Sequence, residues 1–135
     1  QSEVDLWSPG WKVVDVKSKF DGGYYPREYG RTNVLMIGPF TPLKAAGIET
    51  QITVPQTASP KLHIEAASDG QHGDYLLKAF IDNQQVADAV IRSSEFVDVT
   101  ADVQVAAGTK VNVRLEFHAN DWTVESAYIR KVEIR

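Results

Sequence analysis

Two aromatic-rich stretches of the chain carry residue types that could bind a ligand. Residues 20–31 (FDGGYYPREYGR) combine tyrosines and arginines with glycines and a proline, and residues 118–122 read HANDW. An aromatic ring can stack on the apolar C–H face of a sugar, while nearby polar side chains hydrogen-bond the hydroxyl rim. The candidate ligand-binding residues are Tyr24, Tyr25, Arg27, Tyr29, His118, Asn120, Asp121 and Trp122.

The same aromatic residues also have a purely structural interpretation. Bare aromatic side chains are unfavourable in water unless they pack against the protein or bind something. In that interpretation the tyrosine stretch folds over an edge of the domain and buries itself, and Trp122 plugs one end of the core. The sequence leaves both interpretations open.

Catalysis is the weaker alternative. A glycosidase needs two carboxyl groups roughly 5–10 Å apart across a cleft, and Glu125 with Asp121 or Glu116 could supply them. However, the chain contains no Gly-x-Ser-x-Gly, His-Glu-x-x-His or phosphate-loop motif. It also has no cysteine, which excludes a thiolate nucleophile. We therefore predict that the protein is not an enzyme.

The elements that position these residues are predicted to be strands. Residues 111–118 alternate apolar and polar side chains, which is typical of a strand with one buried face. The inward set is Val111, Val113, Leu115 and Phe117, and the outward set is Asn112, Arg114, Glu116 and His118. A second strand running to Ile134 follows a short polar loop, so the last quarter of the chain is expected to close a sheet.

The rest of the chain also alternates strand patterns with turn residues. Strands are predicted at 11–16, 33–38, 48–54, 62–67, 74–81, 84–91 and 96–100, with a tight turn at 82–83. Residues 20–31 are expected to form a long loop or an irregular edge hairpin. Phe80, Phe117 and Tyr128 are expected in the core. No segment shows a helical period, so we predict an all-β antiparallel sandwich or jelly roll of eight or nine strands.

Composition limits the number of domains and the classes of partner. A chain of 135 residues suits one domain, which we place at 11–135 behind an N-terminal arm at 1–10 whose Trp7 packs on the body. The formal net charge is −4 and no basic run occurs, so nucleic acid is not an expected partner. No apolar stretch reaches the roughly 18 residues of a membrane-spanning helix, so membrane insertion is not expected either.

Several short motifs match a known family. They are GRTNVL at 30–35, Val-Pro at 54–55, Asp-Gly at 69–70, GDY at 73–75, IDN at 81–83, VDV at 97–99 and DWTVESAY at 121–128. Through them the chain resembles the galactose-binding-domain-like β-sandwich, the jelly roll of many carbohydrate-binding modules. The match covers roughly residues 11–134, with Asn83 standing where glycine is usual.

The resemblance implies a non-catalytic carbohydrate-binding module. Such modules are usually joined to other domains of an exported bacterial protein, so a secreted, periplasmic or cell-surface location is expected. Many hold a structural calcium, for which Asp21, Asp69, Asp74 and Glu125 are candidate oxygen donors. The alternative is a structural or protein-interaction sandwich that binds no glycan.

Overall fold

Ten strands form two antiparallel sheets in the part of the chain that the structure describes. The structure is a computed structural model, and it describes residues 3–15, 22–28, 31–40, 45–68, 74–119 and 125–135. The β9 sheet has the order β1 (Lys12–Asp15), β4 (Ala46–Thr53), β9 (Lys110–Ala119), β6 (Tyr75–Ile81), β7 (Gln84–Ile91). The β10 sheet has the order β2 (Gly22–Glu28), β3 (Arg31–Phe40), β10 (Glu125–Ile134), β5 (Lys61–Ser68), β8 (Val97–Asp102).

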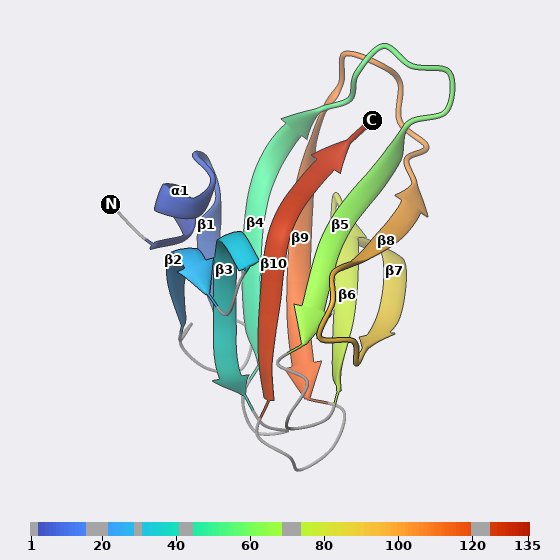
Figure 1. Ribbon diagram of the computed structural model, residues 1–135. Coiled ribbons are helices and arrows are strands. Elements are labelled where there is room, and N and C mark those ends of the chain that lie inside the picture. The colour runs from blue at the N-terminus through green and yellow to red at the C-terminus, as the bar shows by residue number, and fades with distance from the viewer. Residues whose placement is uncertain (1–2, 16–21, 29–30, 41–44, 69–73, 120–124) are drawn as a thin grey trace.

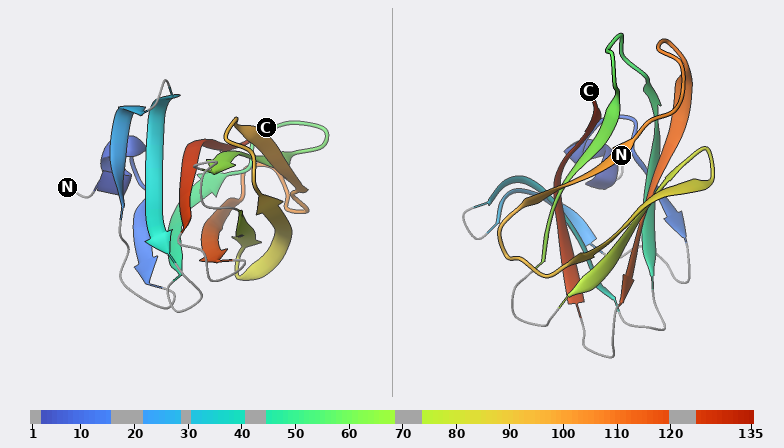
Figure 2. Two further views of the ribbon diagram at one scale, coloured as in Figure 1. Left: turned by 60° about the horizontal axis from the view of Figure 1, so that its bottom comes forward. Right: turned by 90° about the vertical axis from the view of Figure 1, so that its right-hand side faces the viewer.

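The two sheets pack face to face as separate layers (Figures 1 and 2). This arrangement confirms the predicted all-β sandwich. The strand beyond the predicted eight or nine is β2, which pairs with β3 at the edge of the β10 sheet. The described residues of the segment predicted at 20–31 therefore follow the edge-hairpin alternative and not the long loop. An edge strand tolerates Pro26, because its missing N–H breaks no ladder on the solvent side.

β9 lies at the centre of its sheet, between β4 and β6. Its predicted alternation is confirmed, since Val111, Val113, Leu115 and Phe117 are buried while the intervening polar residues face outward. Phe117 lies opposite Ala46 on β4 and Leu77 on β6, and its ring centroid is 6.1 Å from that of Tyr75. The small Ala46 thus leaves room beside the large Phe117 ring, in line with the close packing of protein interiors.

The turn between β6 and β7 is the predicted tight turn at 82–83. Asp82 and Asn83 have φ values of 50° and 68°, which is the left-handed geometry of a two-residue type I′ hairpin turn. Asparagine and aspartate tolerate this region better than other non-glycine residues. The Asp82 carboxylate also accepts a hydrogen bond of 2.9 Å from the backbone N–H of Asn112, which ties the turn to β9.

The N-terminal residues contribute to the core. A short helix, α1 (Glu3–Trp7), lies against β2 and β3 (Figure 1). Trp7 and Trp11 are both buried with ring centroids 5.7 Å apart, and the Trp7 indole Nε1 donates a hydrogen bond of 3.1 Å to the carbonyl oxygen of Asn33. The predicted packing of Trp7 is confirmed. No helix among the described residues is long and apolar enough to cross a membrane.

Tyr75 gives a prediction about alkaline stability. Burial raises the pKa of its phenol far above the usual range, and the hydroxyl donates a hydrogen bond of 3.0 Å to the carbonyl oxygen of Ala67. In the unfolded chain the phenol ionises near pH 10, so below that pH the buried neutral phenol contributes its full share to the stability of the fold. Above it, stability should fall by up to about 1.4 kcal/mol per pH unit.

Tyr75→Phe should remove this part of the alkaline slope, at the cost of about 1 kcal/mol near neutral pH for the lost hydrogen bond. Urea unfolding of both proteins at about pH 8 and about pH 11 measures the difference. Equal alkaline losses in the two proteins would show that Tyr75 is not the responsible group.

Candidate functional site

The outer face of the β9 sheet carries an ordered polar network that includes one predicted site residue, His118. Its ring Nε2 lies 2.9 Å from Oε1 of Glu116, and Nε of Arg114 donates a hydrogen bond of 2.9 Å to Oε2 of the same carboxylate. Nη1 of Arg114 donates a second bond of 2.7 Å to Oδ1 of Asn83 in the β6–β7 turn. Both carboxylate oxygens of Glu116 are therefore engaged, and the three side chains hold one another in place.

These polar side chains are only 14–19% exposed although they lie on the outer face. One reason is Phe80, which is paired with Arg114 across the β6–β9 ladder. The Arg114 guanidinium carbon lies 4.4 Å from the Phe80 ring centroid, a cation–π distance. The face therefore places an apolar ring next to hydrogen-bond donors and acceptors, which are the groups a sugar requires.

Phe80 corrects the sequence prediction. It was expected in the core, but it is half-buried on the outer face, where it packs under Arg114. The segment around it is apolar on both faces, so alternation alone could not tell which parity points inward. β6 is next to the edge of its sheet rather than central, and its outer face meets water and β9 side chains instead of a second layer.

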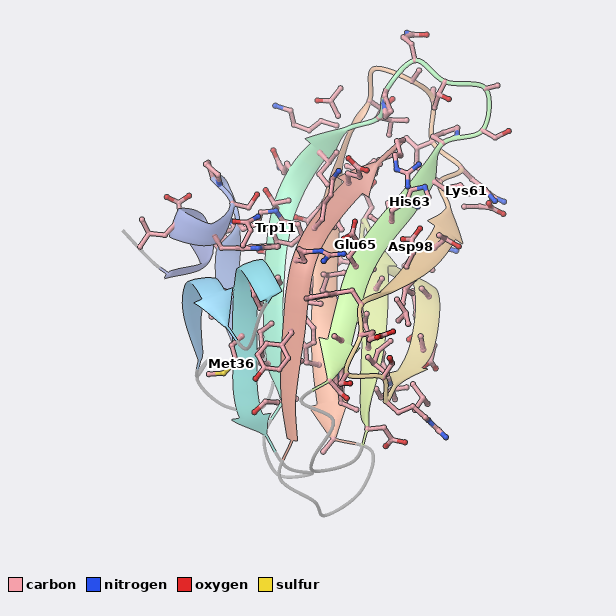
Figure 3. All side chains as sticks on the ribbon, in the orientation of Figure 1. Trp11, Met36, Lys61, His63, Glu65 and Asp98 are labelled. Carbon is pink, nitrogen blue, oxygen red and sulfur yellow. The ribbon has the colours of Figure 1, made fainter. Side chains whose placement is uncertain are left out.

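The outer face of the β10 sheet has a related arrangement. Nδ1 of His63 on β5 lies 3.0 Å from Oδ2 of Asp98 on β8. Both residues are labelled in Figure 3. Arg130 stacks on Phe96 at 4.2 Å and donates a hydrogen bond of 2.7 Å to Glu65. A register shift between Ile129 and Lys131 in the β10–β5 ladder makes Arg130 the additional residue of a β-bulge.

A small apolar cluster also lies apart from the main core, next to this arrangement. Val34, Ala67 and Tyr128 form its buried part, and Met36 and Phe96 pack against them. Met36 is labelled on β3 in Figure 3. Tyr128 is therefore buried as predicted, but in this separate cluster. Each sheet thus carries an Arg–Phe stack and a histidine–carboxylate pair, and the network geometry alone does not select one face as the site.

The structure divides the predicted site residues between the two sheets. Tyr24, Tyr25 and Arg27 belong to β2, the edge strand of the β10 sheet, so of the two predicted forms they adopt the edge hairpin and not the long loop. His118 lies near the end of β9 in the other sheet. The other predicted site residues, Tyr29, Asn120, Asp121 and Trp122, fall outside the described residues. The side chains of the three β2 residues fall outside them as well.

Arg114, Glu116 and Phe80 are the members of the network that the ligand-site prediction did not include. The sequence signal that could have found Arg114 and Glu116 is the run of polar side chains at every outward position of the central strand β9. Residues two apart on a strand share a face, and the predicted alternation placed Arg114, Glu116 and His118 together on the outward face. What the sequence could not show is the contact with Asn83, which depends on how the β6–β7 turn meets β9.

Among the described residues no group of three or more His, Asp or Glu side chains that could hold a metal ion comes together. Asp74 is ion-paired with Arg92, at 3.3 Å. The other candidate donors are Asp21, Asp69 and the side chain of Glu125, and all three lie outside the described part of the chain. The strands that flank these donors begin or end at one common end of the sandwich (Figure 1). Calcium stays a prediction that the resemblance implies.

No family model and no curated protein matches the chain. Several solved structures do match it. The CBM22-1 xylan-binding domain of Paenibacillus barcinonensis Xyn10C has a TM-score of 0.64 at 13% identity, covering 95% of this chain and 86% of that one. The CBM36 carbohydrate-binding module solved with calcium and xylotriose has a TM-score of 0.59 at 14% identity, covering 92% and 99%.

The cleaved adhesin domain of Lys-gingipain from Porphyromonas gingivalis is also similar. Its TM-score is 0.67 at 15% identity, with 96% of this chain and 94% of that chain covered. Likeness at this level of identity concerns the fold. The chain has the β-sandwich jelly-roll fold found in carbohydrate-binding modules.

Proposed function

We propose that this chain is a non-catalytic carbohydrate-binding module of a larger exported bacterial protein. The observation that carries the proposal is likeness over more than 90% of the chain to modules described as xylan-binding or solved with xylotriose. A secreted, periplasmic or cell-surface location and covalent attachment to other domains belong to the same proposal. Fold likeness alone does not establish function, so the proposal also needs a surface with suitable chemistry.

The outer face of the β9 sheet is the surface we propose for the glycan. The part of Phe80 that Arg114 leaves uncovered would meet the apolar face of a sugar ring, while Arg114 and His118 would meet its hydroxyl rim. No covalent bond would form or break. Since Glu116 already holds Arg114 and His118 in place, little side-chain freedom would be lost on binding, which favours affinity.

The remaining predicted ligand residues keep their proposed roles. Asn120, Asp121 and Trp122 follow His118 almost directly in the sequence, so we propose that they extend the same surface at the end of β9. Tyr24, Tyr25, Arg27 and Tyr29 belong to or follow the β2 edge strand, and we propose that they form a second contact region.

A protein-interaction domain is the second candidate. Likeness to the gingipain adhesin domain favours it, because a sandwich of this kind can serve as a docking surface without binding sugar. The two functions differ in whether an isolated chain recognises a polysaccharide.

Affinity electrophoresis separates the two candidates. The protein is run through native gels containing xylan, a soluble cellulose derivative or pectin, beside a gel without polysaccharide. A carbohydrate-binding module should be retarded in at least one gel. Unchanged mobility in all gels, from a protein that melts cooperatively, would favour the interaction domain.

The two outward histidines provide a matched pair of variants for locating the site. His118 and His63 have similar side-chain exposures, 17% and 14%, and each is bonded to a carboxylate, at 2.9 and 3.0 Å. We expect His118→Ala to weaken retardation by roughly twofold to tenfold, the scale of one lost hydrogen bond. His63→Ala should leave retardation unchanged, because it lies on the other outer face.

The melting temperatures of both variants are measured as a control for stability, since each variant loses a comparable histidine–carboxylate pair. Weaker retardation with His63→Ala and not with His118→Ala would move the proposed site to the outer face of the β10 sheet.

A further inference from the structure

A pocket of about 400 Å³ opens on the outer face of the β9 sheet, near the beginning of β9. Its lining residues are Gly10, Lys12, Thr50, Gln51, Lys110 and Asn112. The register explains this grouping. Gln51 lies opposite Asn112 and Thr53 lies opposite Lys110 on the β4–β9 ladder, while Lys12 lies opposite Glu49 on the β1–β4 ladder. The pocket is therefore built by three neighbouring strands and by Gly10, which lies two residues before β1.

The charge of this pocket is opposite to that of the chain. The chain carries 18 acidic and 14 basic residues, yet both ionisable residues that line the pocket, Lys12 and Lys110, are lysines. Lys12 is 3.8 Å from Glu49, a long and exposed ion pair. The Lys110 side chain makes no hydrogen bond or ion pair with the described residues. An uncompensated ammonium therefore borders the pocket.

The other polar groups of the pocket suit an anion that carries hydroxyl groups. The Gln51 amide can donate and accept hydrogen bonds. The Asn112 amide already donates one hydrogen bond from Nδ2 to Oε2 of Glu49, at 3.4 Å, which leaves its second N–H and its oxygen for a ligand. The Thr50 hydroxyl is occupied, because it donates to the Gly10 carbonyl oxygen at 2.9 Å. Asn112 is followed on the same face by Arg114, two residues along β9, so the pocket adjoins the surface proposed for the glycan. Ammonium and amide groups together are typical partners of a carboxylate.

A second pocket provides an internal contrast. It measures about 380 Å³ and lies where the β6–β7 turn approaches the end of β8. Its only ionisable lining residues are two acids, Asp82 and Asp102, and its amides are Gln84 and Gln104. The two pockets have similar volumes and amide groups but opposite charge. An anionic group would be favoured in the lysine pocket and repelled from this one.

We infer that the lysine pocket binds the carboxylate of a uronic acid residue, so that the glycan recognised on this face is an acidic polysaccharide. This inference rests on the proposed function and specifies its ligand class. A neutral glycan would leave the Lys110 ammonium without a partner, whereas a uronate supplies a charged acceptor and hydroxyl groups in one ring.

Methyl β-glucuronide and methyl β-glucoside form a matched pair of probes, because they differ only at C6. Each is titrated into ¹⁵N-labelled protein at low salt and the amide shifts are followed by NMR. We expect the glucuronide to bind more tightly than the glucoside, to shift the amides of Gln51, Lys110 and Asn112, and to weaken as salt is added. Sodium sulfate is titrated in parallel as a simple anion.

Lys110→Gln should weaken glucuronide binding by about twofold to fivefold, the scale of an exposed ion pair, and leave glucoside binding unchanged. Lys131→Gln is the matched control, because it removes the same charge from β10 in the other sheet. Its side chain is 57% exposed and 3.5 Å from Glu133. Neither substitution is expected to change the melting temperature.

Equal binding of glucuronide and glucoside, with no effect of Lys110→Gln, would overturn the inference and leave the proposed function standing. Equal shifts from sulfate and glucuronide would also overturn it, since they would indicate a non-specific anion site. If neither sugar binds and no polysaccharide retards the protein, the inference and the proposed function both fail.

Discussion

Phe117→Ala is expected to destabilise the protein by about 3–5 kcal/mol, from lost transfer free energy and the cavity left behind. Phe117 is fully buried on the central strand β9, where Tyr75 packs beside it. The whole domain is expected to be stable by only about 5–15 kcal/mol. The loss should appear as a much lower urea midpoint with an unchanged slope, because the variant and the unsubstituted protein expose nearly the same additional surface when they unfold.

Phe80→Ala is the matched control for this prediction. It removes the same side chain from a half-buried position on the outer face of the β9 sheet. Truncating a half-buried ring removes less buried apolar surface than truncating Phe117, and it leaves no internal cavity. The loss of stability should therefore be less than half of that for Phe117→Ala. Equal losses for the two variants would contradict the assignment of inner and outer faces on β6 and β9.

Trp7→Ala is expected to cost a comparable amount, about 3–5 kcal/mol. Trp7 is 5% exposed and packs against Trp11 in the main core. Its replacement would also leave the Asn33 carbonyl oxygen without the hydrogen bond from the indole. Thermal or urea unfolding would show whether the N-terminal residues contribute to the stability of the sandwich.

Leu6→Ala is the control for this second prediction, because Leu6 is the adjacent residue and is 50% exposed. A surface substitution of this kind should change stability by no more than about 0.5 kcal/mol. If Trp7→Ala behaved like Leu6→Ala, residues 1–10 would act as a separate arm that adds little to the fold.

The parts of the fold that were predictable are those where one physical signal dominates. On β9 the alternation is strict, since the strand is buried on one face only, and the inward and outward residues follow directly. At 82–83 two residues that tolerate positive φ separate two strand patterns, which indicates a two-residue hairpin turn. Composition and the absence of helical periods were enough to predict an all-β sandwich.

The prediction was incomplete where the strand signal was mixed. β2 contains two glycines and a proline, which usually mark loops. Such residues are tolerated in this strand because it lies at the edge of its sheet. β6 is apolar on both faces, so Phe80 was placed inside although it lies outside. In both segments the deciding information is the neighbouring strand, which the sequence does not give.

The candidate site was less predictable than the fold. His118 was identified from its residue type and its nearness to Trp122, but its partner Glu116 was considered only as a possible catalytic carboxyl. In the structure both oxygens of Glu116 are bonded to neighbouring side chains. The lysine pocket needs residues from three strands that are distant in sequence, since β1, β4 and β9 meet only after the sheet forms.

The most direct test of the proposed glycan site is an NMR titration of ¹⁵N-labelled protein with soluble oligosaccharides from any polysaccharide that retards it in affinity gels. We predict saturable shifts that gather on the outer face of the β9 sheet, from Asn112 to His118 and at Phe80, with little change at His63 and Glu65. Shifts confined to the outer face of the β10 sheet, or no shifts with any oligosaccharide, would contradict the account.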